Sequence, residues 1–114
     1  MSAYGVIGSR SFNDYDLLKS ELDKYKITKI VSGGAKGADS LAEKYALENN
    51  IPVEIHKPDW SLGRGAGIIR NKTIVEHSDV LVAFWDGESK GTLSSIKHGE
   101  KHAKPTIIVR YNSL

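Results

Sequence analysis

The chain has 114 residues, of which 39% are hydrophobic and 26% are charged, and this is the size and composition of one globular domain. It contains no cysteine, which excludes thiol nucleophiles, thiolate zinc sites and iron–sulfur clusters. A net charge of +2 without a basic arm does not favour nucleic-acid binding. No basic leader or membrane-length apolar stretch is present, so we expect a cytoplasmic protein without a membrane partner.

Apolar runs alternate with segments of helical periodicity along the whole chain, which is typical of a parallel sheet with helices on both faces. We expect strands at residues 3–7, 28–31, 52–55, 79–84 and 106–109. Helices are expected after Asn13, from about Ala38, from about Ala66 and from Gly91–Thr92. Gly99, inside the last helix, predicts close packing of that helix on the sheet. The sequence therefore predicts one α/β domain over residues 1–114.

Glycine-rich loops follow four of the predicted strands and precede helices. In an open parallel sheet such loops share the carboxyl edge, where helix N-termini and free backbone N–H groups bind ligands. In the first loop, Gly8, Ser9 and Arg10 combine a sharp turn with a hydroxyl and a planar guanidinium that suits phosphate. A capped turn with a solvated arginine is the structural alternative.

The second loop, residues 32–39, is the strongest local signal, because small residues that lead into a helix N-terminus form an anion cradle. It matches neither the dinucleotide fingerprint nor the P-loop. Asp39 already complements the helix dipole, so we expect it to accept a ribose hydroxyl. A purely structural turn is the alternative. The candidate binding residues of this loop are Ser32, Gly33, Gly34, Lys36, Gly37 and Asp39.

The third and fourth loops add an aromatic ring, a guanidinium and hydroxyls. Trp60 either stacks on a base or covers the edge of the core. Thr92 either caps the last helix or binds phosphate through its hydroxyl. The candidate binding residues of these loops are Trp60, Arg70, Asn71, Asp86, Ser89, Gly91 and Thr92.

The four histidines give a weak metal signal. His98 and His102 are spaced i, i+4, but no H-E-x-x-H pattern or third ligand accompanies them. His56 and His77 fall near the ends of predicted elements. We therefore expect solvated histidines and no metal site, and the sequence identifies no cofactor.

The chain resembles the small YspA/YpsA-related branch of the SLOG superfamily of Rossmann-like domains. The resemblance spans nearly the whole chain and rests on G-S-R, V-S-G-G-A-K-G-A-D-S-L-A, D-W…G-x-x-A-G…R-N and D-V-L-V-A-F-W-D-G-E-S-K-G-T, in this order. It implies a doubly wound sheet of five parallel strands in the order 3-2-1-4-5, with a nucleotide-like ligand at the glycine-rich edge. Relatives include the Lonely guy phosphoribohydrolases and the Smf/DprA proteins, which bind single-stranded DNA.

The chain departs from the Lonely guy pattern after its fourth loop. Where those enzymes carry glutamates two and three residues after a threonine, this chain has Ser94 and Ser95. A hydroxyl does not supply the fixed negative charge of a carboxylate. Asp39, Asp59, Asp86 or Glu88 could replace the missing carboxylate, with Asp39 and Glu88 as the candidates, and the catalytic residues stay open.

We therefore expect a protein that binds a nucleotide or a nucleotide derivative. Gly33, Gly34 and Gly37 would present N–H donors to phosphate, with Arg10, Arg70 and Thr92 adding bonds. The alternative is an N-glycosidic hydrolase of nucleoside monophosphates. A DprA-like DNA binder ranks last, because Asp39, Asp59, Asp86 and Glu88 offset most of the charge of Arg10, Lys36, Arg64, Arg70 and Lys90. Nucleic acid is thus not an expected partner, and a homo-oligomer is left open.

Overall fold

A computed structural model describes residues 2–111, except for the side chain of Arg64. Five parallel strands form one sheet in the order β3-β2-β1-β4-β5. Their bounds are β1 Ala3–Gly8, β2 Lys29–Ser32, β3 Val53–Ile55, β4 Val80–Trp85 and β5 Thr106–Arg110. The connections contain α1 Tyr15–Leu22, α2 Ala38–Glu48, the 3-10 helix η1 Trp60–Gly65, α3 Ala66–Glu76 and α4 Lys90–Lys101.

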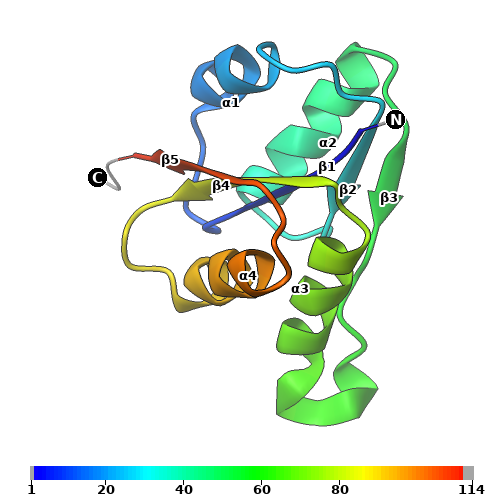
Figure 1. Cartoon of the computed structure of the whole chain (residues 1–114), viewed down its shortest axis with the longest axis vertical. Helices are drawn as coiled ribbons and strands as arrows, with labels where there is room; N and C mark the ends of the chain where they lie inside the picture. The colour runs from blue at the N-terminus through cyan, green and yellow to red at the C-terminus, as the bar shows by residue number, and fades with distance from the viewer. Residues whose placement is uncertain (1, 112–114) are drawn as a thin grey trace.

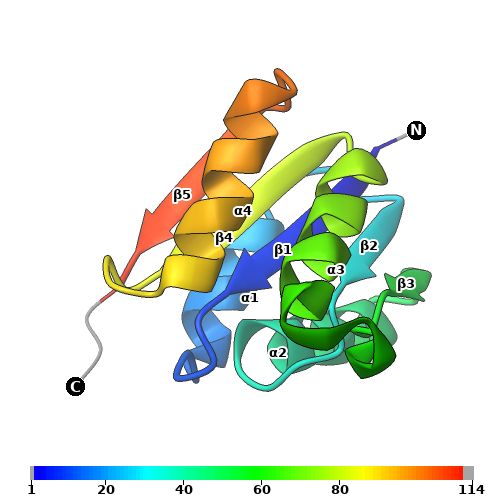
Figure 2. The ribbon, with the colours of Figure 1, turned by 90° about the horizontal axis from the view of Figure 1, so that it is seen from below.

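The helices cover both faces of the sheet. Helices α1 and α2 lie on one face, and α3 and α4 lie on the other (Figure 1). Seen from below, α3 and α4 stand in front of the sheet with α1 and α2 behind it (Figure 2). This arrangement confirms the predicted α/β class and strand order. Within residues 2–111, no helix combines the length and apolar character needed to cross a membrane.

Alternation along the strands builds two cores. Successive strand residues face opposite sides of a sheet, so Val6 and Ile30 join the cluster formed with α1 and α2. Their neighbours Ile7 and Val31 join the cluster formed with Ile74 of α3 and with α4. Both faces of the sheet are therefore buried, which explains why the central strands are almost continuously apolar.

The helix starts differ from the prediction at the caps. Asp14, and not Asn13, caps α1, because its carboxylate accepts the Leu17 N–H at 3.0 Å. Helix α4 begins at Lys90 and not at Gly91, and Ser89 caps it by accepting the Thr92 N–H at 3.4 Å. Asn, Asp, Ser and Thr all cap helices well. Neighbouring candidates of this kind are therefore not separated by sequence pattern.

Two glycines allow close approach of helices and strands. A Cβ added to Gly8, the last residue of β1, would lie 2.7 Å from the Phe84 carbonyl oxygen and 2.6 Å from the Ala38 Cβ. A Cβ added to Gly99 in α4 would lie 2.5 Å from Leu81 Cδ1, which confirms the predicted close packing of that helix. Gly8 thus brings β1, β4 and the start of α2 together at the carboxyl edge.

We expect Gly8→Ala to lower the free energy of unfolding by about 1–3 kcal/mol, because the backbone of β4 and the first residue of α2 do not retreat easily. Gly67→Ala in α3 is the matched control. No atom lies within 4 Å of a Cβ added there, so a gain of up to ~1 kcal/mol from helix propensity is expected. Urea unfolding followed by circular dichroism measures both. Equal stability of Gly8→Ala and the original chain would contradict the close approach.

Candidate functional site

A cleft of about 700 Å³ opens at the carboxyl edge of the sheet, between the loop after β1, η1, α3 and the N-terminus of α4. It gathers residues from all four predicted loops. Eleven of the sixteen candidate binding residues line it, namely Gly8, Ser9, Arg10, Asp39, Trp60, Arg70, Asn71, Asp86, Ser89, Gly91 and Thr92.

The loop after β1 contributes a hydroxyl without a partner. Ser9 is buried, and among residues 2–111 its Oγ has no hydrogen-bond partner. Its N–H donates to the Phe84 carbonyl oxygen at 3.2 Å, which ties the loop to the end of β4. The Ser9 hydroxyl nevertheless contributes to lowering the pKa of Asp86 below its ordinary value. Arg10, the next residue, is exposed. The loop therefore brings a buried hydroxyl and a cation to the cleft.

The N-terminus of α4 forms another wall. Ser89, Lys90, Gly91 and Thr92 all line the cleft. The first N–H groups of a helix have no partner inside the helix, and the helix dipole makes this end attractive to anions. A Cβ added to Gly91 would meet no atom within 4 Å. The first turn of α4 is therefore open to a ligand.

The loop before α4 is held in shape by hydrogen bonds. The Asp86 carboxylate accepts the N–H groups of Glu88 and Ser89, each at 2.8 Å, and Trp85 Nε1 donates to the Ser89 carbonyl at 3.1 Å. The two N–H groups lower the pKa of Asp86 below its ordinary value. Asp86 thus places a fixed negative charge at the cleft.

The second loop differs from the expectation. Ser32, Gly33, Gly34, Lys36 and Gly37 do not line the cleft. The Gly34 N–H donates to Ser32 Oγ at 3.3 Å, and the Gly33 carbonyl accepts Arg70 Nη1 at 2.7 Å. Gly37 has a φ of 79°, and a Cβ there would clash with the Ser9 carbonyl. In this structure the three glycines therefore shape the loop and are not arranged to donate to a ligand in the cleft.

Asp39 is the buried carboxylate of the cleft. It is 7% exposed, and its Oδ2 accepts the Ala35 N–H at 3.2 Å. Burial raises the pKa of Asp39 above its ordinary value, and the charge of Arg70 opposes that rise. Arg70 in turn donates through Nε to Asn71 Oδ1 at 2.8 Å. Asp39 and Arg70 thus form one wall in which the guanidinium is already held.

The remaining candidate residues differ in whether their side chains line the cleft. Trp60 is 64% exposed, so it does not cover the core, and stacking on a base stays a prediction. Glu88 is exposed and does not line the cleft, whereas Ser94 and Ser95 do. The positions that the resemblance aligns with catalytic glutamates therefore face the cleft as hydroxyls. The side chain of Arg64 lies outside the described part of the chain.

Lys90 lines the cleft, although it is not among the binding residues predicted from the sequence. The signal that could have found it is its place in the first turn of a helix after a glycine-rich loop, where a side chain can reach the same anion as the helix N-terminus. With Arg10 and Arg70, Lys90 makes three cations along the cleft against the carboxylates of Asp39 and Asp86. The described lining therefore carries a small positive excess when both carboxylates are ionised.

The fold has a close structural counterpart. DNA processing protein A from Helicobacter pylori, a structure described for its single-stranded DNA binding mode, superposes with a TM-score of 0.71 at 24% sequence identity. The match covers 97% of this chain and 66% of that one. The chain thus spans slightly less than two thirds of that protein, and the likeness shows a shared fold.

Sequence comparison gives the family. The Gene 61 protein of Mycobacterium phage D29 is 35% identical over 115 residues, which cover 90% of this chain and 91% of that protein. A sequence model of the YspA, cpYpsA-related SLOG family matches residues 6–63. The match includes the first two glycine-rich loops and ends within η1. The chain therefore belongs to the YspA, cpYpsA-related SLOG family.

Proposed function

We propose that this protein binds a nucleotide or a nucleotide derivative in the cleft, with a phosphate at the N-terminus of α4. The observation that carries the proposal is the open first turn of α4 beside Arg10 and Lys90. Both cations are exposed, and neither forms an ion pair with another residue of the described range 2–111. Charge-assisted bonds from such groups to phosphate are about twice as strong as neutral ones.

The rest of the cleft suits a base and a ribose. The exposed ring of Trp60 and the side chains of Ile68 and Ile74 line it, and together they offer a stacking surface and apolar contacts. In this proposal Asp39, which lines the cleft, accepts a ribose hydroxyl. A volume of about 700 Å³ falls within the usual range for small-molecule and cofactor sites. We infer a ligand of nucleotide size with one or two phosphates.

Isothermal titration against nucleosides, nucleoside mono- and diphosphates and ADP-ribose-like compounds tests the proposal. We expect binding by phosphorylated compounds, and at least about tenfold weaker binding by the matching nucleosides, because they lose the charge-assisted bonds. A panel without any binding at millimolar concentration would contradict it. Chromatography of the same mixtures separates binding from hydrolysis, since free base would assign N-glycosidic cleavage to the site.

Lys90→Ala should weaken phosphate-dependent binding by about tenfold. Lys36→Ala is the matched control, because Lys36 is also an exposed lysine of a glycine-rich loop but does not line the cleft. The affinity of Lys36→Ala should stay within about twofold of the original, because an exposed charge outside the cleft acts on the ligand only through solvent screened by salt. The same titrations compare both variants. Equal losses in the two variants would mean that general charge, and not the cleft, attracts the ligand.

Single-stranded DNA is a second candidate ligand, although the charge balance of the loops disfavours it. The structural counterpart is described for binding single-stranded DNA, which argues against dismissing nucleic acid as a partner. Trp60 lines the same cleft as Arg10 and Lys90, and a stacking ring beside cations is the usual means of holding a single strand. The acidic side chains of Asp39 and Asp86 oppose it, so we keep the small nucleotide as the first candidate.

Fluorescence anisotropy with a labelled oligo-dT decides between the two ligands. We expect weak or absent binding near physiological salt, because affinity for DNA depends on several released counterions. Submicromolar affinity that falls steeply with added salt, and that Trp60→Ala reduces, would assign the cleft to DNA. A Trp60→Ala effect on nucleotides alone would support the small-ligand site.

The buried carboxylate of Asp39 should lower the free energy of unfolding at neutral pH. Its pKa is raised in the folded state, so the folded chain holds the proton to higher pH than the unfolded chain. Stability therefore falls as the pH rises from 3.8, the ordinary value, through the raised folded value. Asp39→Asn removes this loss, and the variant should be more stable than the original at neutral pH and similar to it in acid.

Asp86→Asn is the control with the opposite sign. The folded pKa of Asp86 is lowered, so its contribution to stability is present above the ordinary value of 3.8 and is lost as the pH falls through the folded value. The Asn variant should therefore be less stable than the original at neutral pH, and the difference should shrink in acid. Urea unfolding across a pH series measures both variants. Parallel curves for the two variants would contradict opposite pKa shifts of Asp39 and Asp86.

A further inference from the structure

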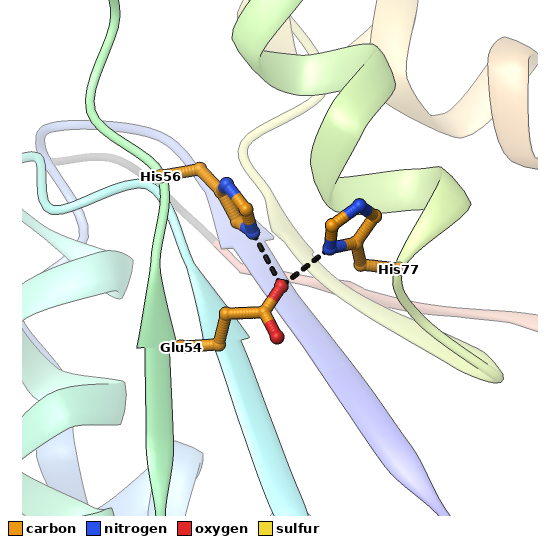
Figure 3. Close-up of side chains that lie close together, drawn as sticks. All are labelled: Glu54, His56 and His77. Carbon is orange, nitrogen blue, oxygen red and sulfur yellow. Dashed lines mark hydrogen bonds and ion pairs between the residues drawn. The ribbon is translucent and has the colours of Figure 1, made fainter.

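Three metal-ligand side chains converge at the β3 edge of the sheet, away from the cleft. Glu54 lies in β3, His56 follows that strand, and His77 is the C-cap of α3. The histidine rings point toward one carboxylate oxygen of Glu54 (Figure 3). Glu54 Oε2 lies 2.5 Å from His77 Nδ1 and is also hydrogen-bonded to His56 Nε2. The three ligand atoms lie within 4.8 Å of one another, and none of these residues lines the cleft.

The fold explains why these residues meet. Residues two apart in a strand point to the same side, so Glu54 and His56 share the face of the sheet that α3 covers. Helix α3 then runs back along the sheet and ends beside β3, where the His77 N–H donates to the Thr73 carbonyl at 3.0 Å. The two histidine rings meet edge to face with centroids 4.8 Å apart. The structure thus brings together two histidines that no sequence pattern connects, while His77 stays half exposed as expected.

We propose that Glu54, His56 and His77 form a binding site for a divalent transition-metal ion of the zinc class. Two imidazole nitrogens with one carboxylate oxygen form a donor set that zinc uses, with a fourth position for water. In tetrahedral zinc sites, bonds of about 2.0–2.1 Å place neighbouring ligand atoms about 3.3 Å apart. Entry of the ion requires the Glu54 oxygen to move away from the two ring nitrogens by roughly 1 Å, and the partial exposure of all three residues leaves room for this movement. The ion replaces the ring protons that hydrogen-bond to Glu54, and these protons pass to solvent.

Lys29 orients the carboxylate. Its Nζ lies 2.6 Å from Glu54 Oε1, so the other oxygen, Oε2, faces the histidines. An outer group that holds a ligand in this way is typical of metal sites. The C-terminal carbonyls of α3 add negative potential beside His77, which favours a cation at this end of the helix.

The same groups define which ions suit the site. Calcium takes six to eight oxygen ligands and magnesium prefers octahedral oxygen, whereas Glu54 is the one oxygen donor of this cluster. The positive charge of Lys29 also disfavours ions held by charge alone. Imidazole nitrogens favour zinc, nickel, copper and cobalt. Zinc and cobalt are therefore the probes, and magnesium is the negative control.

A second histidine pair provides an internal control. His98 and His102 have ring centroids 4.3 Å apart on α4, and His98 Nε2 is buried without a hydrogen-bond partner among residues 2–111. His98 was expected to be solvated, but one of its ring nitrogens, Nε2, is buried. Within the described part of the chain, no third ligand side chain joins this pair, so it is a weaker metal candidate. His102→Ala removes it without touching the Glu54 cluster.

The test uses the full chain without a histidine tag, titrated with zinc or cobalt by calorimetry, with visible absorption reporting tetrahedral cobalt. We expect saturable binding of one ion per chain with a dissociation constant well below about 1 mM, and none for magnesium. His77→Ala and Glu54→Gln should each weaken zinc binding by at least about tenfold, whereas His102→Ala should leave it unchanged. Circular dichroism verifies the fold, and the half-exposed His77 makes its replacement well tolerated.

The possible outcomes distinguish binding at the Glu54 cluster from binding at the His98–His102 pair and from nonspecific binding. Loss of zinc binding in His102→Ala with retention in His77→Ala would overturn the proposal and assign the ion to α4. Binding that no histidine variant alters, or no saturable binding at all, would also overturn it. Retention in His102→Ala with loss in both His77→Ala and Glu54→Gln supports it. Because the cleft shares none of these residues, the metal site stands or falls independently of nucleotide binding.

Discussion

The parallel pairing of β1 with β4 is the constraint on which the rest of the structure depends. The strand order reverses at this pair, because the chain leaves β1 toward α1 on one face and leaves β4 toward α4 on the other. The two loops therefore diverge, and ligands of open α/β sheets bind in the crevice that such a reversal creates. Gly8 keeps the crevice compact, since any side chain there would meet the Phe84 carbonyl.

The second loop and the start of α4 differ in which of their backbone N–H groups already have an acceptor. In the second loop, Ser32 and Asp39 accept the N–H groups of Gly34 and Ala35, so these two donors are already taken. Polar side chains next to glycines often capture backbone donors in this way. The start of α4 has one capping hydroxyl for its first turn, and orphan donors remain there. Helix α2 has no side-chain cap, but Gly33, Gly34 and Gly37 before it do not line the cleft. The proposed phosphate position thus follows from which helix start lines the cleft, and not from which loop has most glycines.

The class of fold was predictable from alternation along the sequence, whereas the strand order required the family resemblance. The position of Arg10 and Thr92 at the cleft was predictable, because any residue after a strand end reaches the same edge. The hydrogen bond from the Gly34 N–H to Ser32 Oγ was not predictable, since side-chain capture of an N–H is not visible in a glycine count. The binding role of all these residues stays a prediction. Glu54 and His77 are 23 residues apart without a motif, and only the return path of α3 brings them together.

Helix α3 connects the two proposed sites and gives them opposite electrostatic character. Its first turns, including Arg70 and Asn71, border the cleft, and its C-cap His77 belongs to the metal-ligand cluster. At 1.5 Å per residue, its 11 residues span about 16 Å. A helix dipole favours an anion at the N-terminal end and a cation at the C-terminal end. The field of one helix therefore supports both a phosphate near the cleft and a zinc-class ion at the β3 edge.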